Sequence, residues 1–377
     1  GSWGHGWILS VWFMWQLLVD TIHVTRDYEE RLPWRQLVAV MKRATSKDVA
    51  ERAGVSRTTV SYVINNKTGG GIRISKETRS RVRTAIEQLG YHPSRAAVSL
   101  RTQRSNLLSI MVPHIESPFH PLFASSVQEE AERFGLDVQV YSTRDSYERE
   151  LRYLDGVIER SIDGLIIHSY QLRKTDLDVL VDAGTAVVVI GPSPSHPFAD
   201  NLVFDERSAV SMMIQSVATA GHRRIGHIAG PLTTWAGNER LLGYRDGLSA
   251  AGLSFDQSLV AGADFYLEES ARSAMEQLMG TGDPPTAIFC CSDLLAVSSL
   301  LYCHDNAIDV PRDLAIVGID GLPLADRVRP RITTIRKDHR ELARLAVRSV
   351  MDRIRADEAL PARLVPLTCE LLHRESL

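Results

Sequence analysis

The feature that most constrains the fold is a series of short aliphatic runs, which alternate with helical stretches from Asn106 onward. The runs read LLSIMVP, DVQVYST, DGLIIHS, AVVVIGP, NLVFDE, RIGHIAGP, LVAGADF, TAIFCCSD and LAIVGIDG. Nearly continuous apolar strands with helices between them are typical of parallel strands buried on both faces. About ten such strands exceed one comfortable sheet. The pattern therefore predicts an α/β fold of two lobes with parallel sheets and a cleft between them.

Polar residues follow many of these runs, at the carboxyl ends of the expected strands. Ligands of parallel sheets bind beyond those ends, so the sequence predicts a small-molecule site there. The positions are Pro113-His114, His168-Ser169-Tyr170, Asp205, Asp264-Phe265, Asp293 and Asp320. Asp320 is interpreted as a cap or hinge residue rather than a ligand-binding one. His227 stands inside an aliphatic run, which favours a packed core histidine.

Charge is divided unevenly along the chain. Residues 41–104 carry 14 Lys and Arg against 4 Asp and Glu, whereas residues 105–377 carry 26 against 38. A short basic segment attached to an acidic body is typical of a polyanion-binding module. The alternative, from charge alone, is a solvated basic surface without a partner.

Local signals in the basic segment predict a helix, a tight turn and a second helix. Thr45 and Asp48 have the spacing of a capping box, and Gly54 supplies a positive-φ stop. Ser56 has the position of a second N-cap, with Thr59 three residues later. This order of signals is the helix-turn-helix arrangement.

A third helix is expected to start at Ser75 and to stop at Gly90. Its apolar stripe is made of Val82, Ala85, Ile86 and Leu89. The basic segment is therefore predicted to be a three-helix module.

The second helix of this module, within VSRTTVSYVINN (residues 55–66), is the candidate reader of DNA bases. Val60, Val63 and Ile64 form its packing stripe, and the polar residues face elsewhere. In a helix-turn-helix the N-terminal residues of this helix contact base edges in the major groove. Arg57 suits guanine acceptors, Thr58 and Ser61 suit bases or phosphates, and Tyr62, Asn65 and Asn66 are further contact candidates. The competing interpretation is a small bundle in which these residues are only solvated caps.

The stretches ATSKDVAERAGVSRTTVSYVINN and ISKETRSRVRTAIEQLGYHPSRAAVSLRT closely resemble the N-terminal module of the lactose-repressor (LacI/GalR) family. The resemblance continues over nearly all of residues 44–377. It implies that a hinge segment inserts a leucine from each subunit into the minor groove, and Leu100 occupies that position. The residues expected to bind DNA are Thr45, Ser56, Arg57, Thr58, Thr59, Ser61, Tyr62, Asn65, Arg95 and Leu100.

The chain departs from the family pattern at two places. The loop KTGGGIRI, between Asn66 and Ser75, is longer than in the founding members. Val98 stands where the family usually carries arginine, which puts the preference for the centre of the operator in doubt.

The acidic body resembles the type I periplasmic-binding-protein fold used as a regulatory domain, most distinctively in GHRRIGHIAGP and VPRDLAIVGIDG. Carboxylates, an arginine and aromatic faces suit a small polyol. His168 and Tyr170 lie where family members vary with their ligand, and Trp235 is a candidate second aromatic wall or, equally, a loop anchor. Asp293 with Arg240 has the alternative of a structural pair between the lobes. The expected effector contacts are Ser117, Phe119, His120, His168, Tyr170, Asp205, Trp235, Arg240, Phe265 and Asp293.

Residues 1–40 do not fit this scheme. They hold five of the six tryptophans, and Met41 precedes the basic module, so residues 1–40 are interpreted as a non-native or mis-called extension. A membrane-associating or partner-binding helix is the competing idea. Residues 41–92 are then the DNA-binding domain, 93–104 the hinge segment, and 105–377 the effector-binding and dimerisation domain.

The candidate classes of function are a ligand-responsive regulator, a transport solute-binding protein and an enzyme. The transport class needs export, but the chain shows no convincing signal peptide and adds a basic helix-turn-helix. The sequence holds no nucleophile elbow, phosphate loop or zinc-protease motif, and its four cysteines show no metal-ligand spacing. We therefore expect a cytoplasmic, nucleoid-associated repressor, which binds a palindromic double-stranded operator as a homodimer. Its expected effector is a saccharide or similar metabolite, with no cofactor, metal or membrane partner.

Overall fold

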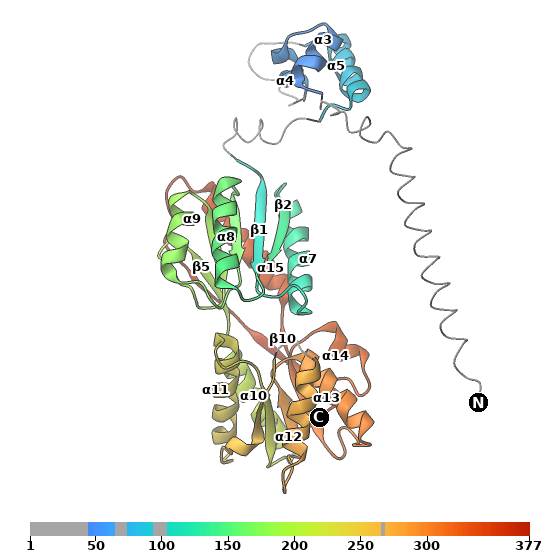
Figure 1. Cartoon of the computed structure of the whole chain (residues 1–377), viewed down its shortest axis with the longest axis vertical. Coiled ribbons are helices and arrows are strands. Elements are labelled where there is room, and N and C mark those ends of the chain that lie inside the picture. The colour runs from blue at the N-terminus through green and yellow to red at the C-terminus, as the bar shows by residue number, and fades with distance from the viewer. Residues whose placement is uncertain (1–43, 65–73, 93–103, 265–267) are drawn as a thin grey trace, which may run out of the picture. The chain divides into compact units, whose positions relative to one another are not determined.

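The computed structural model describes residues 44–64, 74–92, 104–264 and 268–377 (Figure 1). The chain forms two compact units, residues 1–97 and residues 98–377. Within the described ranges, no helix is both long and apolar enough to span a bilayer.

The described residues of the N-terminal unit form three helices, as the sequence predicts. Thr45 caps the first of them through a capping box with Asp48, and Gly54 ends it at a φ of 63°. Ser75 caps the third, and Gly90 ends it at a φ of 56°. The helices are α3 (Ser46–Ala53), α4 (Arg57–Ile64) and α5 (Lys76–Leu89).

One apolar cluster holds the three helices together. Val60 and Val63 of α4 are 0% and 3% exposed, and Ile64 packs against the same cluster. Burying each valine contributes roughly 1.5–3 kcal/mol, so this stripe is what fixes the orientation of α4. The buried members are Val49, Ala50, Ala53, Val60, Val63, Val82 and Ala85.

The first lobe of the C-terminal unit is built on a parallel sheet in the order β11-β5-β4-β3-β1-β2. Five of these strands coincide with the first five aliphatic runs of the sequence. The strands are β1 (Leu107–Val112), β2 (Asp137–Ser142), β3 (Gly164–Ile167), β4 (Ala186–Ile190), β5 (Asp200–Phe204) and β11 (Leu364–Leu367).

The second lobe is built on a sheet in the order β12-β10-β9-β8-β6-β7. All neighbours are parallel except β10 and β12, which pair antiparallel. The prediction of parallel sheets is thus confirmed apart from this pair. The strands are β6 (Ile225–Ala229), β7 (Val260–Gly262), β8 (Ala287–Cys290), β9 (Ala315–Asp320), β10 (Thr333–Lys337) and β12 (Cys369–Leu372).

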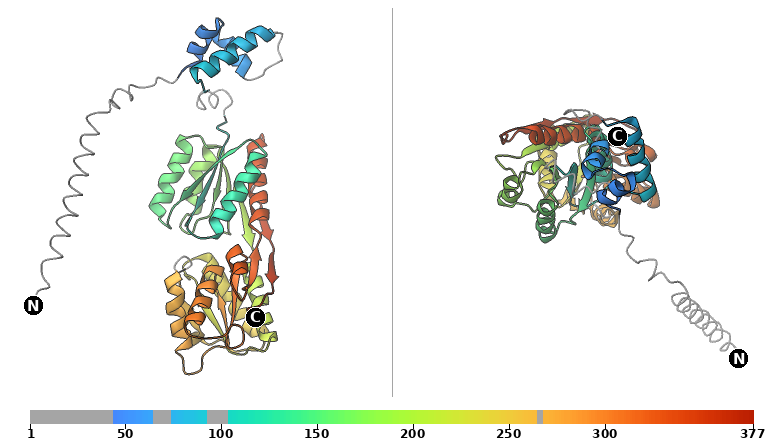
Figure 2. Two further views of the ribbon diagram at one scale, coloured as in Figure 1. Left: turned by 90° about the vertical axis from the view of Figure 1, so that its right-hand side faces the viewer. Right: turned by 90° about the horizontal axis from the view of Figure 1, so that it is seen from above.

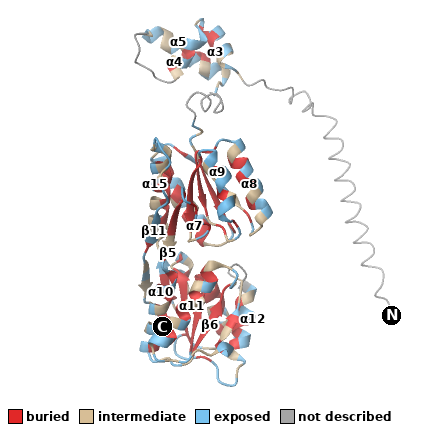
Figure 3. Ribbon diagram, turned by 90° about the vertical axis from the view of Figure 1, so that its left-hand side faces the viewer, coloured by how far each residue is buried: buried red, intermediate tan, exposed pale blue. Residues whose placement is uncertain are grey.

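Helices cover both sheets, so the strands are buried while the outer helix faces are exposed (Figure 3). In the first lobe they are α7 (Phe119–Glu132), α8 (Tyr147–Glu159), α9 (Asp178–Asp182) and α15 (His339–Arg355), with a 3-10 turn at Lys174–Leu177. In the second lobe they are α10 (Glu206–Thr219), α11 (Trp235–Ala250), α12 (Glu268–Met279), α13 (Asp293–Asp305) and α14 (Pro323–Arg327), with a 3-10 turn at Gln257–Leu259.

The chain passes between the lobes three times: from β5 to α10, from β10 to α15, and from β11 to β12. Figure 2 shows these joining segments gathered along one side of the two lobes. The first two passages start where β5 ends at Phe204 and where β10 ends at Lys337. Both of these residues therefore lie at the space between the lobes.

Candidate functional site

The polar residues of α4 lie on the side away from its packing stripe. Arg57, Thr58 and Ser61 are exposed, and Tyr62 is half-buried. A short helix that presents an arginine and two hydroxyls at its N-terminal turns has the side chains that base and phosphate contacts require.

Three other residues expected to bind DNA have their side chains engaged in caps. The Thr45 hydroxyl donates to the Asp48 carboxylate over 2.8 Å. The Ser56 Oγ accepts from the Thr59 N–H over 3.1 Å and lies 2.9 Å from the Thr59 hydroxyl. These hydrogen bonds set the starts of α3 and α4, which positions the exposed residues. The remaining candidates, Asn65, Arg95 and Leu100, lie outside the described residues.

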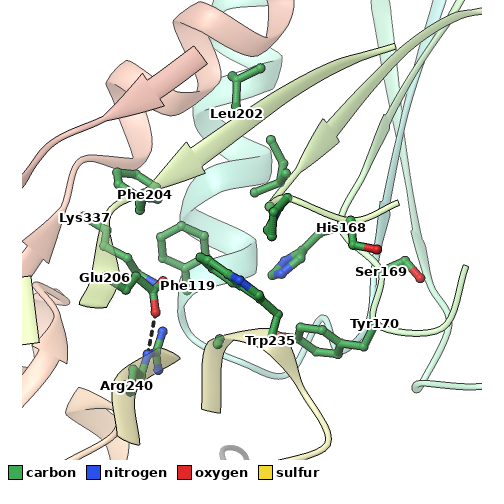
Figure 4. Close-up of a pocket in the computed structure, with 15 residues that line it drawn as sticks. Phe119, His168, Ser169, Tyr170, Leu202, Phe204, Glu206, Trp235, Arg240 and Lys337 are labelled. Atoms are coloured by element: carbon green, nitrogen blue, oxygen red, sulfur yellow. Dashed lines mark hydrogen bonds and ion pairs between the residues drawn. The ribbon is translucent and has the colours of Figure 1, made fainter. Parts of the chain in front are cut away.

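A second candidate site is the pocket between the lobes of the C-terminal unit (Figure 4). The first lobe supplies rings from α7 and from the end of β3, and the second lobe supplies the starts of α10 and α11. Its principal lining residues are Phe119, His168, Tyr170, Phe204, Glu206, Trp235, Arg240 and Lys337. An adjoining part of the same pocket adds Ser117, His120, Ser292 and Asp320.

Four buried charges lie on the second-lobe side of the pocket. The Glu206 carboxylate accepts from Arg240 Nε over 2.6 Å and from Lys337 Nζ over 3.0 Å. Asp320 Oδ1 lies 2.8 Å from Lys337 Nζ and 3.7 Å from an Arg240 nitrogen. We call Glu206, Arg240, Asp320 and Lys337 the charge cluster. Because it joins two cations to two carboxylates, it is electrically balanced.

The geometry of the charge cluster holds Glu206 and Lys337 in their ionised forms. Burial raises the pKa of Glu206, but the charges of Arg240 and Lys337 outweigh it and bring that pKa to about 2. Burial lowers the pKa of Lys337, but Asp320 and Glu206 outweigh it and leave that pKa above its usual value. Each cation is therefore already satisfied by protein carboxylates.

Aromatic rings from both lobes also line the pocket. Lys337 Nζ lies 4.8 Å from the centroid of the Phe119 ring and 5.9 Å from that of Phe204, within cation–π range. The Trp235 and Tyr170 rings also line it (Figure 4). The pocket thus combines apolar ring faces with fixed polar groups, which is the composition of a small-molecule site.

The structure brings seven of the ten expected effector residues to this pocket. They are Ser117, Phe119, His120, His168, Tyr170, Trp235 and Arg240. Phe265 lies outside the described residues.

The other two expected effector residues, Asp205 and Asp293, need correction. Asp205 is exposed and caps α10, where its Oδ1 accepts from the Ser208 N–H over 3.1 Å. It is the next residue, Glu206, whose side chain turns into the pocket. The predicted pocket residue, Asp205, is thus adjacent to the observed one, Glu206. The two differ because successive side chains in the first turn of a helix point to different faces.

Asp293 is fully buried and does not line the pocket. Its carboxylate accepts from the Leu322 N–H over 2.7 Å and from the Thr334 hydroxyl over 2.5 Å, so it ties α13 to two neighbouring segments. Burial raises its pKa to about 7. The alternative of an Asp293–Arg240 pair is also not seen, since Arg240 pairs with Glu206 and Asp320.

Sequence reasoning missed three members of the charge cluster. Asp320 follows the run LAIVGIDG, and its position at the end of a strand favours a cap or hinge residue over a pocket residue. Lys337 ends β10, a strand whose mixed sequence TTIRK resembles no aliphatic run. The interpretation of His227 is confirmed, since it is fully buried and stacks against Tyr244 and Phe289. The described residues contain no group of three or more His, Cys, Asp or Glu side chains that could hold a metal ion.

Two family models match the chain. Residues 45–94 match the model for bacterial regulatory proteins of the lacI family, and residues 214–377 match the periplasmic binding protein-like domain. The first match covers the three helices, and the second begins in α10 and covers the second lobe together with α15 and β11.

Full-length relatives are transcriptional regulators. The transcriptional repressor PurR of Haemophilus influenzae (strain PittEE) is 30% identical over 339 residues, covering 89% of this chain and 98% of PurR. The transcriptional regulator CelR of Thermobifida fusca is 33% identical over 350 residues, with the same coverage of 89% and 98%.

Solved structures agree with these relatives. A CelR–cellobiose complex is 31% identical with a TM-score of 0.65, covering 89% of this chain and 100% of that one. The lac repressor dimer bound to operator and the anti-inducer ONPF has a TM-score of 0.77 over 89% of this chain and 99% of that one, and at 24% identity it shows the shared fold. The chain belongs to the LacI family of bacterial regulatory proteins, which are DNA-binding transcriptional regulators.

Proposed function

We propose that this regulator is a cytoplasmic repressor without catalytic activity, which binds a palindromic operator as a homodimer and responds to a neutral saccharide or a related polyhydroxy metabolite. The observation that carries the ligand class is the charge cluster. Its two cations, Arg240 and Lys337, are already paired with two carboxylates, so neither of them offers an anionic ligand an unmatched positive charge. An anion would have to displace Glu206 or Asp320, at a cost typical of broken buried ion pairs.

The aromatic rings of the pocket support the same ligand class. Phe119, Trp235 and Tyr170 offer flat apolar faces, which suit the C–H surface of a sugar ring. Arg240, Glu206 and Lys337 offer donors and acceptors, which suit hydroxyl groups because a hydroxyl both donates and accepts. The solved complex of the relative CelR contains cellobiose, a neutral sugar.

Operator recognition is assigned to α4. Its N-terminal residues Arg57, Thr58 and Ser61 are exposed, while Val60 and Val63 seat the helix on α3 and α5. Two such modules in a dimer would read two half-sites related by the symmetry of the operator. Arg57 is proposed to bind guanine edges, with Thr58, Ser61 and Tyr62 on neighbouring bases or phosphates.

Coupling between ligand and operator is proposed to run through the three passages between the lobes. Glu206 and Lys337 each begin or end an element at a passage, and they also line the pocket. A ligand that binds one pose of the lobes more tightly shifts the population toward that pose. Couplings of about 1–3 kcal/mol are typical, which corresponds to roughly 5- to 150-fold in operator affinity.

The experiment that tests the proposal is a selection of genomic fragments bound by the full chain, repeated with and without a panel of neutral sugars and the matching sugar phosphates. We expect enrichment of one palindromic sequence, and a change in its recovery with one neutral sugar or a group of related neutral sugars. Sedimentation in the presence of the selected fragment should give two chains for each operator. Recovery that responds only to sugar phosphates would overturn the ligand class, and one chain for each site would overturn the dimer.

A further inference from the structure

Two histidines in the wall of the pocket are joined by a direct hydrogen bond. His120 Nε2 lies 3.0 Å from His168 Nδ1, with the rings nearly perpendicular and 5.1 Å apart. The other nitrogen of His120, Nδ1, lies 2.5 Å from the backbone carbonyl oxygen of His114. The His168 ring points into the pocket toward Trp235 (Figure 4).

These contacts assign the protons of both rings. A carbonyl oxygen only accepts, so the proton of His120 must be on Nδ1. A neutral imidazole carries one proton, which leaves His120 Nε2 as an acceptor. The hydrogen bond between the rings then requires a proton on His168 Nδ1. In a neutral His168, the remaining nitrogen Nε2 holds a lone pair.

The surroundings keep both rings neutral. Burial lowers the pKa of His120 to about 4. Burial also lowers the pKa of His168 well below its usual value, with a further decrease from the charges of His120 and Lys337. A proton added to either ring would face the positive charge of Lys337, and a proton on His120 Nε2 would also remove the acceptor for the His168 Nδ1–H.

The backbone around His168 is held independently of its ring. The His168 N–H donates to the Met111 carbonyl oxygen over 2.8 Å. The next residue, Ser169, donates its hydroxyl to Glu150 over 2.8 Å and accepts from the N–H groups of Gln171 and Leu172. The ring direction is therefore set by His120 on one side and by a fixed turn on the other.

We infer that His120 acts as a positioning residue, which locks His168 in the tautomer with its proton on Nδ1 and presents Nε2 to the pocket as a hydrogen-bond acceptor. This inference rests on the proposed function. Given that function, the tautomer requires an effector that donates a hydroxyl or N–H hydrogen bond to His168. A carboxylate, phosphate or carbonyl oxygen is rejected there, because two acceptors would face each other without a proton. The pocket thus accepts at His168 and donates at Arg240 and Lys337.

The test is a long-range ¹H–¹⁵N spectrum of the full chain labelled with ¹⁵N-histidine, recorded at pH 7 without effector or DNA. Ring nitrogens with and without a proton resonate far apart, so each of the 12 histidines reports its own tautomer. His168→Gln removes and thereby assigns the His168 signals. We expect a protonated Nδ1 and an unprotonated Nε2 in the wild-type chain. A proton on His168 Nε2 would overturn the inference.

A second variant tests the positioning role of His120. His120→Phe removes the acceptor for His168 Nδ1–H, so the His168 proton should move wholly or partly to Nε2, and His120→Gln, which offers an amide oxygen, should return part of it. His227 is the internal control, because its Nδ1 lies 3.0 Å from the Phe289 carbonyl oxygen and has no contact with the pair. A folded His120→Phe chain with His168 still protonated on Nδ1 would contradict the role of His120. The wild-type spectrum decides the tautomer even if this variant does not fold, and since no ligand is present its result is separate from the outcome of the operator selection.

Discussion

The Glu206 carboxylate and the Lys337 ammonium meet at 3.0 Å, and this ion pair joins the first residue of α10 to the last residue of β10. Both residues stand at passages between the lobes, and each side chain is less than a tenth exposed. The same two side chains line the pocket between the lobes. The pair therefore connects the pocket wall directly to two of the segments that join the lobes.

Glu206→Gln should destabilise the C-terminal unit by about 3 kcal/mol, because it leaves Arg240 and Lys337 with Asp320 as their remaining carboxylate. Urea titration of the free energy of unfolding measures this. Asp205→Asn is the matched control, since that exposed residue caps α10 and asparagine caps equally well. A Glu206→Gln chain as stable as the control would show that the charge cluster contributes little.

Glu150→Gln should change how stability depends on pH. Glu150 accepts from the Thr143 and Ser169 hydroxyls, yet burial raises its pKa from 4.5 to about 7. Between these values the folded chain keeps a proton that the unfolded chain has released, so this carboxyl makes stability fall as pH rises. The contribution amounts to about 3 kcal/mol over that window.

The measurement is the difference in unfolding free energy between wild type and Glu150→Gln from pH 4 to pH 8. Glutamine does not ionise, so the unfolding free energy of the variant should increase relative to that of the wild type as pH rises from 4.5 to 7. Above pH 7 the difference should stay constant. Glu159→Gln, at an exposed position at the end of α8, is measured alongside as the control for the substitution itself. A flat difference for Glu150→Gln would mean that the pKa of Glu150 is the same in the folded and the unfolded chain.

Arg57→Ala should relax base preference at one position of each operator half-site. A bidentate arginine–guanine pair discriminates by about 1–3 kcal/mol, which is roughly 5- to 150-fold. Selection from a randomised site measures this. Lys47→Ala is the control, because Lys47 is an exposed cation on α3 that pairs with Glu51 over 3.6 Å. Lys47→Ala should weaken binding to all operator sequences by a similar factor. An unchanged base preference in Arg57→Ala would show that Arg57 does not contact a base.

The sequence predicted the elements well, because their signals are local. Caps at Thr45, Ser56 and Ser75 and stops at Gly54 and Gly90 depend on neighbouring residues, and aliphatic runs report burial on both faces of a sheet. The position of the cleft could be predicted from the polar residues that follow the aliphatic runs, because the carboxyl ends of parallel strands meet at one edge of a sheet.

The details of the pocket depend on contacts between distant segments, which no local pattern reports. Lys337 reaches Glu206 from 131 residues away and comes from a strand of mixed composition. Asp205 and Glu206 are adjacent carboxylates at the start of one helix, and only the packing of α10 decides that the second of them turns inward. Asp293 is expected in the pocket because it follows a strand. Instead, its carboxylate accepts hydrogen bonds from two segments more than 28 residues away, and these contacts hold it inside the lobe.

Trp235 should report effector binding by its fluorescence. It begins α11 and lines the pocket, and the other five tryptophans all lie within residues 1–40. A sugar ring that covers the indole would replace water at its face and so change its emission.

The emission change on adding a neutral sugar recovered from the panel is measured in wild type and in Trp235→Phe, with binding followed separately by calorimetry. We expect the change to disappear in the variant, while affinity falls less than about tenfold because phenylalanine keeps an aromatic face. Trp235→Ala should lose more affinity, and both variants should bind operator normally without sugar. Calorimetric binding with unchanged wild-type emission would place the sugar away from Trp235 and would identify this residue as a loop anchor.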